Sequence, residues 1–94
     1  MLAVGLLTVE LHISGARSLK DKRRVLMSLK DRLYKLNVSL AETGHHDLRQ
    51  RSQLSIVAIA THRDVVDRSL DAVLTEVERH DPGLIVATDV EWLS

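Results

Sequence analysis

The spacing of hydrophobic residues changes along this chain in a fixed order, and that order is the strongest constraint on its fold. Residues 3–13 alternate apolar and polar side chains, which is the pattern of a strand with one buried face. Residues 18–37 instead repeat leucines at helical spacing. Strand patterns follow over 38–43 and 54–60, then a second helical pattern, then a last strand over 84–92. The predicted order is strand, helix, strand, strand, helix, strand.

Capping signals place the helix boundaries. Ser18 followed by Asp21 has the spacing of a capping box, so we expect the first helix to begin near Ser18 and to end at Asn37. Thr61 and Asp64 repeat that spacing before the second helix. The only proline and the glycine after it should stop that helix. The inward side chains of the second helix are then Val66, Leu70, Val73 and Val77.

Two strands are less simply defined by their patterns. The segment 54–60 is apolar on both faces, so it should be central, and residues 48–53 either extend it as a hairpin arm or belong to the preceding loop. In the last strand, alternation predicts one common face for Leu84, Val86, Thr88, Val90 and Trp92.

The element order predicts an α+β fold of the ferredoxin-like β-α-β-β-α-β type. Two right-handed split crossovers would place both helices on one face of a four-stranded antiparallel sheet, with the first and third strands central. No linker or low-complexity stretch divides the 94 residues, so we expect a single ferredoxin-like domain over 1–94. Tyr34 and Trp92 are the only aromatic residues, so aliphatic side chains must build the core.

Composition excludes several classes of protein. The chain has no cysteine, which rules out disulfides, thiol nucleophiles and Cys-ligated zinc, and fits a reducing cytoplasm. Residues 1–9 are apolar, but Glu10 and His12 interrupt the run, so it predicts neither a signal peptide nor a membrane span. We therefore expect a cytoplasmic protein with no membrane partner.

Charge is balanced overall and uneven along the chain. Residues 1–51 hold ten Lys and Arg against five Asp and Glu, whereas residues 52–94 hold three against eight. The first helix and the residues around it contain the densest cationic stretch. We expect these side chains to reach solvent together and to bind phosphate groups, with the helix N-terminus near Ser18 contributing its dipole. The alternative is a solvated face that only keeps the domain soluble. The candidate anion-binding residues are Arg17, Ser18, Lys20, Lys22, Arg23, Arg24 and Lys30, joined by Arg49 and Arg51 if the loop over 44–53 folds toward them.

The face of the sheet away from the helices carries polar residues and a smaller apolar area. Alternation places Thr8, Glu10 and His12 outward, and Asp89 and Glu91 beside them. Near Val4 and Leu6 the same face is apolar, and is either a homodimer surface or a half-covered sheet edge. The strands lack the aromatic residues on which RNA-recognition motifs stack bases, so any RNA should be bound by the basic helix and loop.

Catalytic and metal-binding patterns are weak. Glu10 and His12 share a strand face that Glu42 could approach, which would allow proton transfer. The segment 14–18 is similar to the anion-binding loops of small acyl-phosphate hydrolases, which pair an arginine, here Arg17, with a positioned asparagine. The only asparagine, Asn37, is predicted at the far end of the helix. The run His45-His46-Asp47 has no diagnostic metal spacing, so we expect it to organise a turn or contact another chain. We expect no enzyme activity, metal or cofactor.

Four segments, GLLTVELHI, SLKDKRRVLMSLKDRL, NVSLAETGHHDLRQR and VEWL, resemble the YlxP-like family of small bacterial proteins. The resemblance spans nearly the whole chain and implies a ferredoxin-like fold. Family genes often lie among those for translation initiation and ribosome maturation factors, which implies an RNA- or ribosome-associated role. The family has no established catalytic residue, so the resemblance assigns none to this chain. Arg49 stands where family members often have tryptophan. The matching family positions are Ser18, Leu19, Lys20, Lys22, Arg23, Glu42, His45, Asp47, Gln50 and Arg51.

The leading hypothesis from the sequence is a cytoplasmic accessory protein that contacts RNA or ribosomal particles through the basic face of the first helix. The first alternative is a self-associating protein–protein module that uses the open sheet face. The second is a small hydrolase of phosphorylated substrates. Glu42, His45, Asp47 and Gln50 are additional loop candidates for a functional site.

Overall fold

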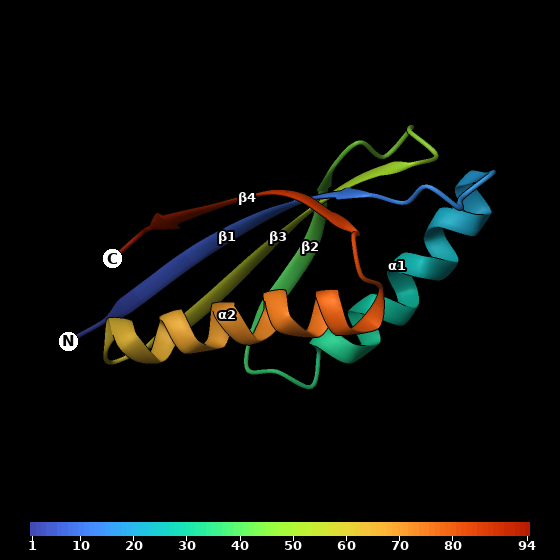
Figure 1. Ribbon diagram of the computed structural model, residues 1–94. Helices are drawn as coiled ribbons and strands as arrows, with labels where there is room; N and C mark the ends of the chain where they lie inside the picture. The colour runs from blue at the N-terminus through green and yellow to red at the C-terminus, as the bar shows by residue number, and fades with distance from the viewer.

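A computed structural model describes residues 1–94 as one sheet with two helices packed on one of its faces (Figure 1). The sheet order β2-β3-β1-β4 is antiparallel throughout, with β1 and β3 in the centre, as the sequence predicted. The chain termini lie at one end of the sheet, and the β2–β3 connection and the start of α1 lie at the other (Figure 1). The elements in chain order are β1 Ala3–His12, α1 Leu19–Leu33, β2 Ser39–Gly44, β3 Arg51–Ala60, α2 Arg63–His80 and β4 Ile85–Trp92.

The core forms where aliphatic residues of the two central strands meet both helices. Leu7, Leu11 and Ile56 are fully buried from the sheet side, and Leu29 and Val73 from the helices. Val66 and Leu70 of α2 lie close to the backbone of β1 at Gly5. A Cβ added to Gly5 would lie 2.8 Å from Val66 Cγ1, so this approach requires a glycine.

The helix ends differ from the sequence predictions. Ser18 caps α1 as expected, and its Oγ accepts a hydrogen bond from the Asp21 backbone N–H. The helix ends at Leu33 rather than Asn37, because Leu36 N–H already bonds to Leu33 in a tighter turn. The cap of α2 is His62, which makes no side-chain hydrogen bond, so the capping box predicted at Thr61 is wrong.

Pairing with β1 sets where β3 begins and which side chains of β4 share a face. β3 begins at Arg51, since the long β1 provides partners as far as the pair His12 and Arg51. In β4 the register shifts opposite Glu10 and Leu11, so Ile85 rather than Val86 pairs with Leu11. The single face predicted for β4 is therefore wrong at Val86, which is exposed.

Candidate nucleic-acid interface

The start of α1 satisfies two of the backbone donors around it. Ser18 Oγ accepts from Asp21 N at 3.1 Å, and Asp21 Oδ2 accepts from Arg17 N at 3.0 Å. Two N–H groups that an anion could have met at this helix end are thus already bonded. The backbone N–H groups of Leu19 and Lys20 and the exposed side chain of Arg17 remain for a ligand here.

Lys22 is buried, with 2% of its surface exposed. Its Nζ donates to the carbonyl oxygens of His45 at 2.8 Å, Arg51 at 3.1 Å and His46 at 3.3 Å. It also lies 3.6 Å from Glu42 Oε2, which in turn accepts a hydrogen bond from Ser52 Oγ at 2.8 Å. Lys22 therefore holds the β2–β3 connection against α1, and the expectation that it reaches solvent with the other cations is corrected.

Gln50 and Arg49 fix the same connection to the segment before α1. Gln50 Nε2 donates to the carbonyl oxygens of Ala16 at 3.0 Å and Ser14 at 3.2 Å, and Arg49 donates to Arg17 O at 3.4 Å. These bonds join residues more than thirty positions apart in the sequence. They bring Arg49 and Arg51 beside Arg17, so the loop over 44–53 does fold toward the first helix, which was the condition for these two residues to join the other cations.

The remaining candidate cations are exposed at this end of the molecule, except Lys30, which is half-buried. None of these side chains makes a salt bridge. The cations that do pair with acidic residues are Lys22 and the more distant Arg32, Arg68 and Arg79, with His45 paired to Glu10. No residue of the acidic second half of the chain therefore forms an ion pair with this surface. We call it the cationic end, and define it as Arg17, Lys20, Arg23, Arg24, Arg49 and Arg51.

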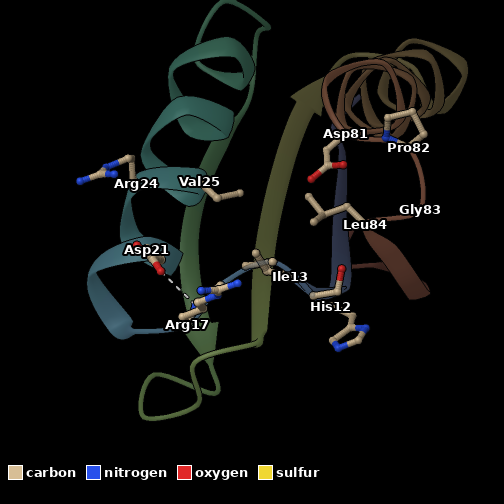
Figure 2. Close-up of a pocket in the computed structure, with 13 residues that line it drawn as sticks. His12, Ile13, Arg17, Asp21, Arg24, Val25, Asp81, Pro82, Gly83 and Leu84 are labelled. Carbon is tan, nitrogen blue, oxygen red and sulfur yellow. Dashed lines mark hydrogen bonds between the residues drawn. The ribbon is translucent and has the colours of Figure 1, made fainter.

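Two open clefts lie on either side of Arg17. The first, of about 490 Å³, separates the start of α1 from the α2–β4 connection, and Asp21 and Asp81 line it together with Arg17. Arg24 also lines this cleft, and its side chain points outward from α1 (Figure 2). The second cleft, of about 510 Å³, is lined by Ala16, Arg17, Leu48, Arg49, Gln50 and Arg51. It contains three arginines and no acidic residue, so it is the more favourable of the two for an anion.

The loop candidates mainly shape the backbone. His45 has a left-handed φ of 60°, and its Nε2 lies 2.9 Å from Glu10 Oε2. Glu42 is held by Lys22 and Ser52, as described above. Asp47 lies exposed in the connection between β2 and β3. No group of three or more histidine and acidic side chains is arranged to hold a metal ion.

The catalytic alternatives do not assemble. Gln53 donates to Glu10 Oε1 at 2.6 Å, and this hydrogen bond lowers the pKa of the Glu10 carboxyl, with His45 acting in the same direction. Glu42 does not approach Glu10, because Glu42 bonds to Ser52, which points to the opposite sheet face from Gln53. Arg17 and Asn37 lie beyond opposite ends of α1, about 22 Å of helix apart, so they do not form the hydrolase pair.

The sequence did not predict that Lys22, Gln50 and Ser52 hold the β2–β3 connection and its neighbouring groups in place. One signal for Lys22 was present: Leu19, Lys22, Leu26, Leu29 and Leu33 are spaced by three or four residues, so Lys22 lies on the buried stripe of the helix. A lysine on such a stripe needs a buried partner, which the acid at Glu42 provides. The partners of Gln50 had no comparable local signal. No helix has the length and apolar character needed to cross a membrane.

Solved structures similar to this chain support the fold. The de novo designed protein Foldit4 has a TM-score of 0.62 at 9% identity, covering 100% of this chain and 98% of its own. SnoaB, a cofactor-independent oxygenase from Streptomyces nogalater, has a TM-score of 0.59 at 11% identity, covering 98% and 92%. The designed protein LFR1 1, described as having a ferredoxin fold, has a TM-score of 0.54 at 12% identity, covering 100% and 87%. At these identities the likeness concerns the ferredoxin-like fold alone.

Sequence comparison gives the family. The chain is 33% identical over 90 residues to the uncharacterized protein YlxP of Bacillus subtilis (strain 168), which covers 95% of this chain and 98% of that protein. The model of the family described as protein of unknown function (DUF503) matches residues 4–90. The resemblance noted from the sequence motifs is thereby confirmed, and the chain belongs to the DUF503 family.

Proposed function

We propose that this protein is a non-enzymatic cytoplasmic accessory protein that binds RNA, free or within ribosomal particles, through the cationic end. One observation carries the proposal. Six exposed cationic side chains, from α1, the segment before it and the β2–β3 hairpin, gather at one end of the molecule, and none has an acidic partner within salt-bridge distance. Such a surface gains affinity for a nucleic acid by displacing counterions from its phosphates.

The open sheet face is unsuited to the same task. Its outward residues include Glu10, Asp89 and Glu91, and β1 and β3 carry no aromatic side chain on which a base could stack. The lowered pKa of the Glu10 carboxyl keeps that position negatively charged near neutral pH. Phosphates should therefore approach α1 and the β2–β3 connection, and the sheet should stay free of RNA.

Charge reversal at α1 tests the proposal. In the triple variant Lys20→Glu, Arg23→Glu and Arg24→Glu, we expect affinity for single-stranded ribosomal RNA fragments to fall at least about tenfold at low salt. The slope of log affinity against log salt should flatten by about 2, because each lost phosphate contact on a single strand removes about 0.7. Fluorescence anisotropy measures both quantities.

A matched control separates the site from net charge. The variant Arg63→Glu, Arg68→Glu and Arg79→Glu makes the same charge change on exposed residues of α2. It should retain more of the affinity and salt slope than the α1 variant. Equal losses in the two variants, or no detectable RNA binding by the native protein, would refute the proposal. Co-sedimentation of native protein with ribosomal particles, lost in the α1 variant, would extend it to the ribosome.

A second candidate function is self-association through the apolar part of the open sheet face. There Val4 and Leu6 lie beside Val57 and Ile59 on the central strands, and 58% of Ile59 is exposed. Light scattering at high protein concentration decides this alternative. A monomer that persists at all concentrations would exclude the homodimer, whereas a dimer should dissociate in an Ile59→Lys variant.

A further inference from the structure

The second cleft beside Arg17 differs from the rest of the cationic end in the residues that line it. Three of its six lining residues are arginines, Arg17, Arg49 and Arg51, and none is acidic. The neighbouring cleft of similar volume, in contrast, contains the carboxylates of Asp21 and Asp81. The two clefts share Ala16 and Arg17, and the two carboxylates of the neighbouring cleft offset the charges of Arg17 and Arg24 there, whereas no acidic residue lines the second cleft.

The backbone that carries these arginines is fixed before any ligand arrives. Gln50 bonds to the carbonyls of Ser14 and Ala16, and Lys22 bonds to the carbonyl of Arg51 from beneath the connection. Arg49 uses one guanidinium donor on Arg17 O and keeps its others for a ligand. A ligand would therefore need to order arginine side chains but not the loop, which lowers the entropic cost of binding.

The number of cations indicates which kind of phosphate fits. A phosphodiester within a strand carries one negative charge, whereas a phosphate monoester carries about −1.5 to −2 at pH 7 and has three terminal oxygens. Planar guanidinium groups bind such oxygens in pairs, and three arginines can surround one monoester. We propose that the arginine cleft binds the terminal phosphate monoester of an RNA strand, an inference that rests on the proposed function and assigns its ligand.

Paired oligonucleotides test the inference. We would compare native protein binding to one RNA sequence that carries a phosphate at its 5′ end, a phosphate at its 3′ end, or hydroxyl groups at both ends. One terminal phosphate should raise affinity about tenfold over the hydroxyl form, as expected for charge-assisted arginine contacts. In the variant Arg17→Gln, Arg49→Gln and Arg51→Gln, this preference should disappear.

The control variant neutralises the other half of the cationic end. Lys20→Gln, Arg23→Gln and Arg24→Gln remove the same charge, and should weaken binding of all three oligonucleotides while the preference for a terminal phosphate stays intact. Circular dichroism confirms that both variants keep the native helix content. The two triple variants thus separate recognition of the strand end from attraction to the backbone.

The outcomes distinguish this inference from the proposed function. Equal affinities of the native protein for phosphorylated and hydroxyl RNA would overturn the inference and leave RNA binding standing. A preference that survives in the Arg17, Arg49 and Arg51 variant would also overturn it. A third outcome is that no RNA binds, while adenosine 5′-monophosphate, but not adenosine, shifts amide NMR signals of residues 16–17 and 48–51. The cleft would then bind a small phosphorylated molecule, and the assignment of RNA as its ligand would be wrong.

Discussion

Replacing Lys22 with methionine removes one ammonium group and keeps the length of its aliphatic chain. Three backbone carbonyls, at 2.8–3.3 Å from Nζ, would lose their donor, and Glu42 would lose its cation at 3.6 Å. Removing one partner of a buried ion pair typically costs about 3–5 kcal/mol. Two of the three carbonyls belong to His45 and His46, which lie in an exposed connection where water can replace the lysine. We therefore expect the lower end, a loss of about 3 kcal/mol in the free energy of unfolding.

Chemical denaturation followed by far-UV circular dichroism measures that loss. For a domain of this size it corresponds to a decrease in melting temperature of more than about 10 °C. Lys20→Met is the matched control, since Lys20 is exposed in the same helix and should change stability by less than about 0.5 kcal/mol. A double-mutant cycle with Glu42→Gln isolates the ion pair from the carbonyl bonds. A free energy of unfolding for Lys22→Met within about 1 kcal/mol of the native value would refute the reasoning. It would show that leaving the three carbonyls and Glu42 without the lysine has almost no effect on stability.

Two further predictions concern the sheet. Gly5→Ala should destabilise the protein by about 1–3 kcal/mol, because the Cβ of the alanine would lie 2.8 Å from Val66 Cγ1. Urea denaturation measures this loss, and an unchanged free energy of unfolding would show that the helix and sheet layers separate easily. Glu10 has a lowered pKa because Gln53 and then His45 hydrogen-bond its carboxylate, so the unfolded chain binds more protons than the folded one at acid pH. This stabilisation is complete above the ordinary value of 4.5 and is lost as the pH falls through the lowered pKa. The stability difference between native protein and Glu10→Gln should therefore shrink as the pH falls from neutral through 4.5 and then through the lowered pKa, and a constant difference would contradict this assignment.

The motif residues that carry the family resemblance have a clear structural role. Ser18 caps α1, Lys22 and Glu42 pair beneath the β2–β3 connection, and Gln50 ties that connection to the segment before α1. His45 contributes its carbonyl to Lys22 and its ring to Glu10. These five positions hold the framework, whereas the exposed arginines at its surface are the ones available to a ligand. Arg49 adds a third cation to the cleft, beside Arg17 and Arg51.

Much of the fold follows from local pattern alone. The strand and helix periods of β1 and α1, the cap at Ser18 and the inward stripe from Val66 to Val77 are all encoded within a few residues of themselves. Such patterns report which face of an element is buried, and their order leaves few topologies that bury all these faces together. The exposure of most α1 cations follows in the same way, because they lie off the leucine stripe.

Only the tertiary structure decided how the cationic end is assembled. The bonds from Lys22 to His45 and from Gln50 to Ala16 span 23 and 34 residues, and no local spacing encodes them. They depend on the β2–β3 register, which shifts between Glu42 and Gly44 and sets where the following connection meets α1. A register shift of one residue reverses which side chains face the helices, so the sheet pairing decides that Glu42 and the connection carbonyls meet Lys22 and that Arg17, Arg49 and Arg51 share one cleft.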